Sequence, residues 1–180
     1  MRVISGRAKG VLLKTPDGML TRPTADRVKE AMFSILQFEL SGARVLDLFG
    51  GTGQLGIEAI SRGAKSAVFV DAREEACRLI RENLKRANMV SEGTVLRSDY
   101  LSFLKKCTDS FNIVLLDPPY AEEFLENSLK MITEIDILQS GGIIITERPV
   151  GKEFLCQFSG FTRSRDYKYG KTLLTVFRKD

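Results

Sequence analysis

A short apolar run that ends in glycines is the first place where the sequence could do chemistry. The run covers residues 44–49, and Gly51, Gly53 and Gly56 follow it with the spacing G-x-G-x-x-G. Glycines let the backbone turn tightly and approach a ligand, and the start of a following helix offers free amide groups. Asp71, 20 positions after Gly51, could accept the hydroxyls of a ribose. Together these features predict a site for a cofactor that contains adenosine.

The glycine pattern leaves the cofactor open, because a dinucleotide dehydrogenase and an S-adenosylmethionine enzyme both fit it. Asp47, which comes just before the glycines, offers a hint. A carboxylate there would repel a pyrophosphate, whereas it would attract the ammonium and sulfonium groups of S-adenosylmethionine. The charge of Asp47 therefore favours S-adenosylmethionine over a nicotinamide dinucleotide.

A second constellation follows the apolar run 113–116, where the chain reads Asp117-Pro118-Pro119-Tyr120. The two prolines fix backbone dihedrals and remove two N–H groups, which leaves rigid carbonyls beside a carboxylate and an aromatic ring. Asp117 and the carbonyl of Pro118 could accept the two hydrogens of an exocyclic amine, while Tyr120 stacks on the base. The motif therefore favours chemistry on the amine of a nucleobase.

These residues need a parallel sheet to bring them together, since ligands of such sheets bind outside the carboxyl ends of the strands. Apolar runs that are each followed by a helical pattern are typical of a parallel sheet with helices on both faces. We expect strands at residues 44–49, 67–70, 94–96, 113–116 and 142–146. We expect helices after a cap at Thr24, over 54–62, around 76–84 and over 122–135.

Hairpins are predicted at both ends of the chain. Residues 2–5 and 11–14 read as short strands joined by a basic loop with a glycine at each end. Strands near 162–167 and 172–177 turn through Gly170. The second hairpin would add antiparallel pairing at one edge of the parallel sheet.

The composition removes whole classes of mechanism. The chain has 180 residues, no histidine and three cysteines that lie far apart. Without an imidazole there is no serine or cysteine protease chemistry and no histidine metal site. The odd, scattered cysteines argue against a disulfide framework and suit a reducing compartment. With no signal-peptide core and no run near the ~20 residues of a membrane span, we expect a cytoplasmic protein without a metal or a membrane partner.

The net charge of +4 is unevenly placed along the chain. Residues 1–29 and 148–180 each carry a net charge of +5, whereas the part between them carries −6. Basic ends could meet the phosphates of a nucleic acid, although scatter over a solvated surface explains a small excess equally well.

Four segments of the chain resemble the bacterial family that methylates the 2-amino group of a guanine in 16S ribosomal RNA. They are residues 2–6, 21–33, 45–53 and 116–120. The resemblance covers nearly the whole chain in order and length, and Asp-Pro-Pro-Tyr is its most specific motif together with the segment around Arg-Pro-Thr. It implies a class I S-adenosylmethionine-dependent methyltransferase fold of α/β, Rossmann-like type. That fold has a mostly parallel seven-stranded sheet, helices on both faces and a C-terminal antiparallel hairpin. It also implies a single domain, with residues 1–20 as a basic hairpin extension and 21–180 as the catalytic core.

The resemblance also implies where the cofactor binds. Asp47, Gly51 and Gly53 would hold the methionine part of S-adenosylmethionine. Asp71 would take the ribose, as its spacing already suggested.

Two further segments complete the implied cofactor site. Ser98 and Asp99 would hold the adenine edge, while Arg22 and Thr24 would close over the cofactor's carboxylate. For Asp99, a cap on a helix that begins at Tyr100 is an equally good interpretation.

The implied reaction is transfer of a methyl group to the guanine amine, in which Asp117, Pro118 and Tyr120 hold the base. The partner would be 16S ribosomal RNA or the assembled small ribosomal subunit, and nothing requires more than a monomer. The residues expected to contact RNA are Arg2, Arg7, Lys9, Pro119, Arg165 and Lys168. Alternatives are an amino-methyltransferase for another RNA or for DNA, a dehydrogenase that uses NAD, and an RNA-binding module without activity.

Overall fold

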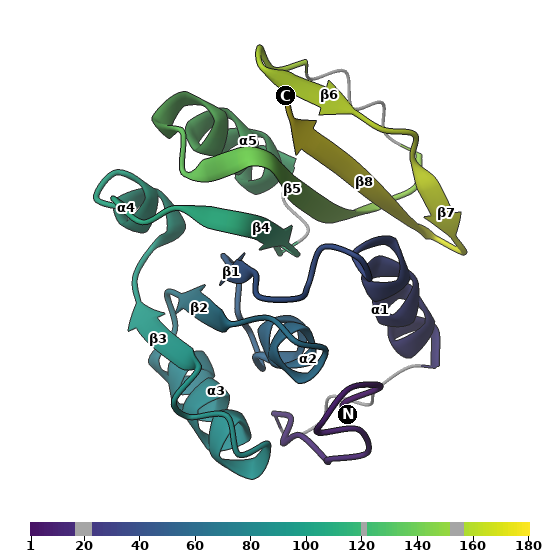
Figure 1. Cartoon of the computed structure of the whole chain (residues 1–180), viewed down its shortest axis with the longest axis vertical. Coiled ribbons are helices and arrows are strands. Elements are labelled where there is room, and N and C mark those ends of the chain that lie inside the picture. Colours follow the sequence, from purple (N-terminus) through teal and green to yellow (C-terminus); the bar gives the residue numbers. More distant parts are fainter. Residues whose placement is uncertain (17–22, 120–121, 152–156) are drawn as a thin grey trace.

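The computed structural model describes residues 1–16, 23–119, 122–151 and 157–180 (Figure 1). In these residues the strands form one sheet with the order β3-β2-β1-β4-β5-β8-β6, and β7 pairs with β8 beside β6. The strands are β1 (Arg44–Asp47), β2 (Ser66–Asp71), β3 (Gly93–Arg97), β4 (Phe111–Leu116), β5 (Leu138–Pro149), β6 (Phe161–Arg163), β7 (Tyr167–Tyr169) and β8 (Thr172–Lys179). The described sheet has eight strands where seven were predicted, because β6 and β7 both pair with β8 on its outer side and divide the last position between them.

The pairing of the strands is parallel from β3 to β5 and antiparallel from β5 to β6. Helices α2 (Gln54–Ser61), α3 (Glu74–Arg86), α4 (Tyr100–Leu104) and α5 (Glu122–Ile135) connect the parallel strands, as crossover connections require. Helix α1 (Pro23–Ile35) precedes β1. The predicted α/β class with a mostly parallel sheet and a C-terminal antiparallel region is therefore confirmed.

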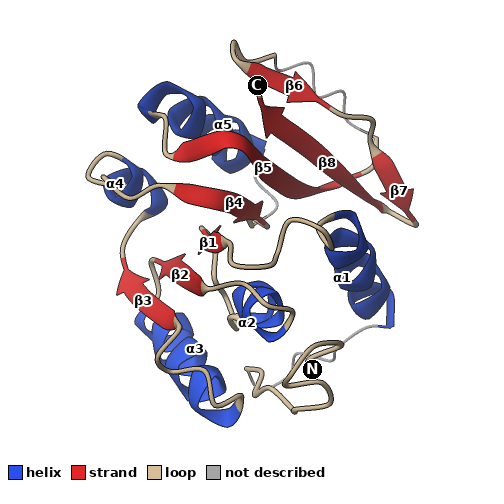
Figure 2. Ribbon diagram, viewed as in Figure 1, coloured by secondary structure: helices blue, strands red, loops and turns tan. Residues whose placement is uncertain are grey.

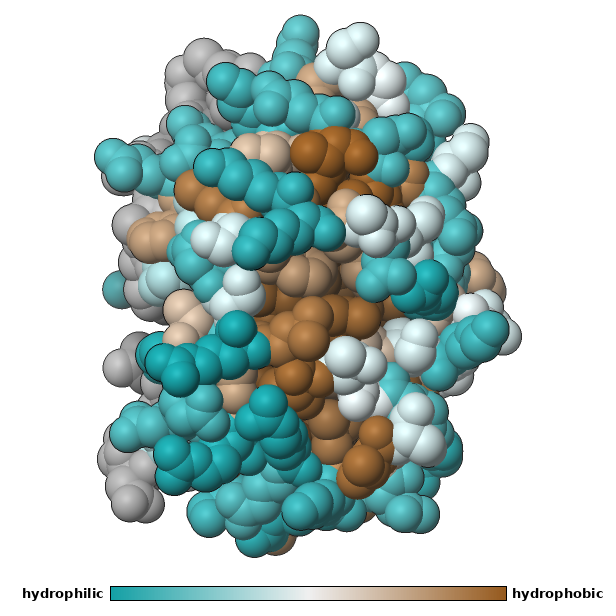
Figure 3. Space-filling model, turned by 90° about the vertical axis from the view of Figure 1, so that its left-hand side faces the viewer, coloured by the Kyte–Doolittle hydropathy of each residue, from teal (hydrophilic) through white to brown (hydrophobic). Residues whose placement is uncertain are grey.

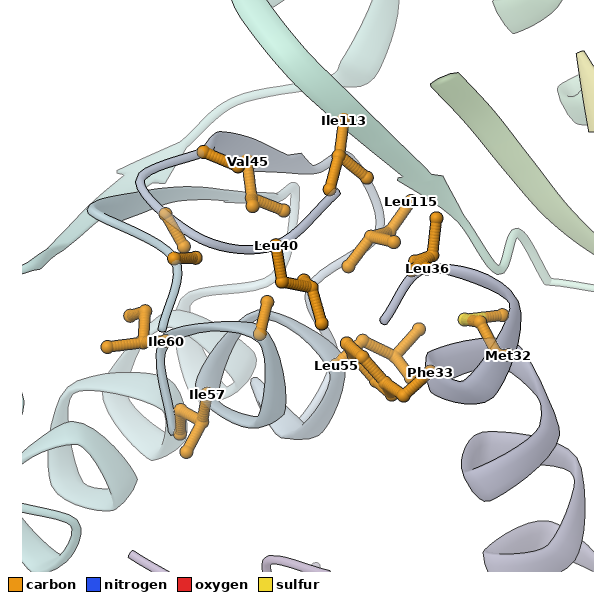
Figure 4. Close-up of a cluster of buried hydrophobic side chains, with 14 of the residues drawn as sticks. Met32, Phe33, Leu36, Leu40, Val45, Leu55, Ile57, Ile60, Ile113 and Leu115 are labelled. Atoms are coloured by element: carbon orange, nitrogen blue, oxygen red, sulfur yellow. The ribbon is translucent and has the colours of Figure 1, made fainter. Parts of the chain in front are cut away.

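Helices cover both faces of the sheet (Figure 2). Successive apolar side chains of each strand point to opposite faces, so both faces are hydrophobic and each needs a covering layer. In β4, Ile113 and Leu115 pack into the layer that contains α1, α2 and α3, whereas Val114 and Leu116 pack into the layer that contains α4 and α5. Figure 4 shows the first layer, where Phe33 of α1 reaches toward α2 beneath the sheet. The two hydrophobic layers fix the plane of the sheet, and with it the edge where its carboxyl ends meet.

The predicted N-terminal hairpin is formed only in part. Residues 1–3 and 10–13 pair through an antiparallel bridge between Arg2 and Leu12 and through backbone hydrogen bonds such as Val3 N–H to Val11, but neither segment is a regular strand. The backbone instead turns toward α2, where the buried carboxylate of Glu58 accepts hydrogen bonds from the N–H groups of Ile4 and Ser5. Because the N–H groups of Ile4 and Ser5 are bonded to Glu58, they are not available for pairing with the other segment, and the hairpin pairing stops at Val3.

Two smaller predictions also need correction. Thr24 lies inside α1, which the structure describes from Pro23 onward, and not ahead of the helix as expected. The single strand expected near 162–167 is interrupted over residues 164–166, so it forms β6 and β7. Asp166 is held in this break by the side chains of Arg148, Arg163 and Thr175, which draw the chain away from the ladder.

β3 forms the outer edge of the sheet and is the most exposed strand of its parallel part. Leu96 is 39% exposed there, and a band of hydrophobic side chains runs down this face of the molecule (Figure 3). Within the described residues, no helix is long and apolar enough to cross a membrane.

Candidate active site

The carboxyl ends of four neighbouring strands each carry a carboxylate. Asp47 ends β1, Asp71 ends β2, Asp117 follows β4, and Glu147 lies near the end of β5. Parallel pairing places these ends along one edge of the sheet, in the order β2-β1-β4-β5. The structure thus brings together the three aspartates that the sequence singled out, and it adds Glu147.

Asp47 is almost fully buried, and its carboxylate accepts a hydrogen bond of 3.0 Å from the N–H of Gly56 in α2. Burial raises the pKa of Asp47 to about 7, and the nearby charges of Asp117 and Asp71 push it in the same direction. No lysine or arginine of the described chain forms an ion pair with it. A buried carboxylate without a cationic partner is costly, so it provides a strong attraction for a cationic ligand.

The glycine loop lies between Asp47 and Asp71. Gly51 and Gly53 have φ angles of 54° and 78°, the left-handed region that side chains disfavour. The N–H of Gly51 donates to Asp71 across 3.0 Å, and Gly53 is the residue that precedes α2. The glycines therefore allow the backbone conformation of the loop, and the hydrogen bond to Asp71 attaches the loop to the end of β2.

Arg73 is a neighbour of Asp71 that sequence reasoning missed. Its backbone N–H and its guanidinium both donate to the Asp71 carboxylate, at distances of 2.9 to 3.2 Å. The side chain of Arg73 is 70% exposed, whereas that of Asp71 is 9% exposed. A ribose that uses Asp71 must share it with Arg73 or displace the guanidinium into solvent.

Ser98 and Asp99 follow β3, next to the end of β2. The N–H of Ser98 donates to the backbone carbonyl of Asp71, which places the two strand ends side by side. The Asp99 carboxylate accepts from the N–H groups of Leu101 and Ser102, so it caps α4. The capping interpretation of Asp99 is thus confirmed, while an adenine contact stays a prediction.

Asp117 and Glu147 form an acidic pair on neighbouring strands. Leu116 of β4 pairs with Thr146 of β5, so the next residue on each strand is a carboxylate. Burial raises the pKa of Asp117 to about 6. Burial and the charge of Asp117 raise the pKa of Glu147 to about 7, against a hydrogen bond from Thr172 that lowers it. Glu147 could have been found from the sequence, because it directly follows the predicted strand 142–146.

The remaining predicted residues are more dispersed. Pro118 is half-buried beside Asp117, and Pro119 is exposed. Arg22 and Tyr120 lie outside the described residues, as does the side chain of Thr24. Nothing in the structure therefore tests the aromatic stacking or the closure over the cofactor.

The basic residues expected to contact RNA lie on two parts of the chain. One is the N-terminal segment, and the other surrounds β7, where Lys168 lies across β8 from Arg148 at the end of β5. Arg2, Lys9, Arg165 and Lys168 are exposed. Arg7 is also exposed, but its guanidinium is engaged by Glu92. Contact with RNA remains a prediction for all of them.

The donor set fits S-adenosylmethionine. The fit rests on Asp47, whose burial without a cationic partner suits an ammonium or sulfonium group. Asp71 and the Gly51–Gly53 turn suit a ribose and a backbone approach. Among the residues with described positions, no group of three or more potential ligands is arranged to hold a metal ion.

Known proteins share this architecture over the full chain. The family described as conserved hypothetical protein 95 matches residues 1–178. YlbH of Bacillus subtilis, described as a candidate rRNA methyltransferase, is 38% identical over 182 residues, which cover 99% of each protein. The ribosomal RNA small subunit methyltransferase D of Escherichia coli K12 is 33% identical over 180 residues, covering 100% of this chain and 90% of that protein.

A solved structure supports the same assignment. The Escherichia coli protein yhhF, described as a candidate methyltransferase, superposes with a TM-score of 0.91 at 29% identity, covering 100% of this chain and 98% of that one. The resemblance inferred from the motifs is thereby confirmed. The chain belongs to the family described as conserved hypothetical protein 95, the family of the ribosomal RNA small subunit methyltransferase D proteins.

Proposed function

We propose that this protein transfers a methyl group from S-adenosylmethionine to the exocyclic 2-amino group of a guanine in 16S ribosomal RNA. Relatives in its family are named for methylation of small-subunit ribosomal RNA. The observation that carries the proposal is the position of Asp117-Pro118 at the end of β4, two residues beyond Leu115, which is the register partner of the buried and uncompensated Asp47 on β1. Such a site can hold a cation and an amine next to each other.

The cofactor half of the site lies over β1 and β2. Asp47 attracts the positive charge of S-adenosylmethionine, and the Gly51–Gly53 turn lets the backbone come close to it. Asp71 would hold the ribose, either sharing its carboxylate with Arg73 or displacing the Arg73 guanidinium. A methyl group carried on a sulfonium leaves sulfur without help from an acid, so this chemistry needs no histidine.

The substrate half lies over β4 and β5. Asp117 and the backbone carbonyl of Pro118 accept the two hydrogens of the amine, whose lone pair is otherwise delocalised into the ring. Two acceptors favour a tetrahedral nitrogen and aim its lone pair at the methyl carbon, a positioning effect. As the nitrogen–carbon bond forms and the carbon–sulfur bond breaks, Asp117 takes the proton that the nitrogen loses.

The proposal is tested by methyl transfer with tritiated S-adenosylmethionine onto unmodified small-subunit RNA, both free and assembled with its proteins. We expect label on one guanine, and mapping of the modified nucleoside identifies its 2-amino group. We expect Asp117→Ala to lower the rate by at least about 100-fold, because the amine loses its acceptor, while cofactor binding survives. Glu134→Gln, an exposed change on α5, serves as the control and should keep full activity.

Titration calorimetry separates the alternative functions. Binding of S-adenosylmethionine without binding of NAD supports a methyltransferase, whereas binding of NAD alone would indicate a dehydrogenase. Binding of neither cofactor, together with retained RNA binding, would indicate a module without activity. Label on an adenine or cytosine of the small-subunit RNA would change the methylated base, whereas absence of label on this RNA, with transfer to another RNA or to DNA, would change the substrate. The cytoplasmic location and the monomeric state remain predictions from the sequence.

A further inference from the structure

Glu147 is the carboxylate of the acidic pair that the reaction described above leaves unused. It follows Thr146, just as Asp117 follows Leu116, and these two preceding residues are register partners on neighbouring parallel strands. Neighbouring strands lie about 4.8 Å apart. Both carboxylates also continue the positions of β4 and β5 that face the α1–α3 layer, as Leu115 and Ile145 do. Two acceptors are therefore available side by side on the same face of the sheet.

The strand order places Glu147 on the substrate side of Asp117. β4 lies between β5 and β1, so Asp117 separates Glu147 from Asp47 and the glycine loop. Glu147 is half-buried, and in the described part of the chain it forms no ion pair that would neutralise it. Thr172 on β8 lies close enough to its side chain to lower the pKa of Glu147. A carboxylate kept half-buried and without a cation is suited to accept hydrogen bonds from a ligand.

The chemistry of the nucleobases decides which ligand suits a second acceptor at this place. In guanine the exocyclic amine is flanked by the ring N1–H, which is a donor. In adenine and cytosine the amine is flanked by a ring nitrogen with a bare lone pair, which a carboxylate repels. We infer that Glu147 selects guanine by accepting a hydrogen bond from N1–H beside the amine that Asp117 holds. This assignment deepens the proposed function and rests on it.

The test replaces the target guanine by 2-aminopurine in small-subunit RNA assembled from synthetic and transcribed pieces. The analogue keeps the 2-amino group but has a bare lone pair at N1 and no oxygen at position 6. The wild-type enzyme should methylate guanine about 10- to 100-fold faster than 2-aminopurine, the range expected for a hydrogen bond to a charged group. Glu147→Gln can donate from its amide, so its preference for guanine should fall to less than about threefold.

Controls separate this role from a structural one. Glu147→Gln keeps an acceptor for the Thr172 hydroxyl and should bind S-adenosylmethionine and melt as the wild type does, while Glu134→Gln should keep the full preference for guanine. Equal loss of rate on both bases by Glu147→Gln would overturn the inference, although guanine methylation by the wild type would leave the proposed function intact. Failure of the wild type to methylate guanine at all would overturn both.

Discussion

At the scale of single residues, Asp47 stands where its charge is useful to function and costly to the fold. It is almost fully buried, and its described partner is the N–H of Gly56. Because Asp117 and Asp71 add negative charge nearby, the ionised form of Asp47 is further disfavoured. A cationic ligand would stabilise the ionised form of Asp47. The same carboxylate therefore favours binding of a cation and lowers the stability of the unliganded fold.

The pH dependence of stability should report this conflict. Burial raises the pKa of Asp47 from 3.8 to about 7, so between these values the folded state binds more protons than the unfolded state. The free energy of unfolding must therefore fall as pH rises through this window. We expect the free energy of unfolding of Asp47→Asn not to fall in this way, because the variant has no group that titrates at this position. Above pH 7 the variant should be more stable than the wild type by about 2 to 4 kcal/mol.

Urea unfolding of both proteins across the window measures the difference, and calorimetry with S-adenosylmethionine measures its functional counterpart. The wild type should bind the cofactor more weakly as pH falls below about 7, whereas Asp47→Asn should bind weakly throughout. Parallel stability curves for the two proteins would show that Asp47 does not carry the buried charge.

At the scale of elements, the N-terminal segment is anchored by side chains that helices α2 and α3 bury. Glu58 and Ser61 of α2 accept backbone N–H groups from residues 4, 5 and 8. Asn83 of α3, also fully buried, bonds both backbone groups of Lys14 and the carbonyl of Thr52 in the glycine loop. The segment that the charge pattern assigns to RNA is thus joined to the loop assigned to the cofactor.

The anchoring can be tested at Gly6, where a Cβ atom would lie 1.9 Å from the backbone oxygen of Ser61. We expect Gly6→Ala to push the segment off α2 and to leave Glu58 buried without its backbone donors, at a cost of about 3 kcal/mol. Gly10→Ala is the matched control, since Gly10 also has a positive φ but no atom within 4 Å of its Cβ position. That change should cost about 1 kcal/mol, from backbone strain alone.

Hydrogen exchange and thermal melting of the two glycine variants provide the measurement. Amides of residues 4, 5 and 8 should lose protection in Gly6→Ala and keep it in Gly10→Ala, because the steric clash exists in the first variant alone. Equal effects in both variants would mean that the segment is held by its own turns rather than by α2.

The same elements show what a sequence can predict. The apolar runs of β1 and β4 and the stripe of α5 were predicted nearly to the residue, because burial on both faces or on one stripe leaves a local pattern. The N-terminal hairpin was predicted only in part. Its two segments pair at Arg2 and Leu12, but they do not form full strands, since Glu58 and Asn83, more than 50 positions away, bind backbone groups of Ile4 and Lys14. The hydrophobic pattern of a short segment does not indicate which distant side chains will bind its backbone groups.

The candidate site divides in the same way. Asp47, Asp71 and Asp117 were predicted because each follows an apolar run or a glycine motif, and the structure brings them to one edge. Glu147 was missed although it follows a strand, because its importance depends on the register of β5 against β4. Arg73 was missed because its contact with Asp71 depends on the conformation of an exposed side chain, which the spacing of residues in the sequence does not indicate.

At the scale of the whole molecule, the charge distribution separates a negative site from positive ends. The middle of the chain, with its net charge of −6, contains the carboxylates at the strand ends, whereas each end of the chain carries +5. Figure 1 places the N-terminal segment and β7 on either side of α1. A nucleic acid bound to both ends would thus be held by its phosphates while the acidic edge receives a single base.

Salt dependence of RNA binding tests this division of roles. Each phosphate contact should add about 0.7 to the slope of log affinity against log salt for single-stranded RNA. We expect Lys9→Ala and Lys168→Ala each to lower that slope by about this amount, because both side chains are exposed and no ion pair in the described chain engages them. Arg7→Ala should lower it less, since Glu92 already holds the Arg7 guanidinium. Filter binding of small-subunit RNA from low to high salt gives the slopes, with Lys130→Ala on α5 as a control of equal charge change. Slopes unchanged in Lys9→Ala and Lys168→Ala would show that the positive ends are a solvated surface and that the RNA is held elsewhere.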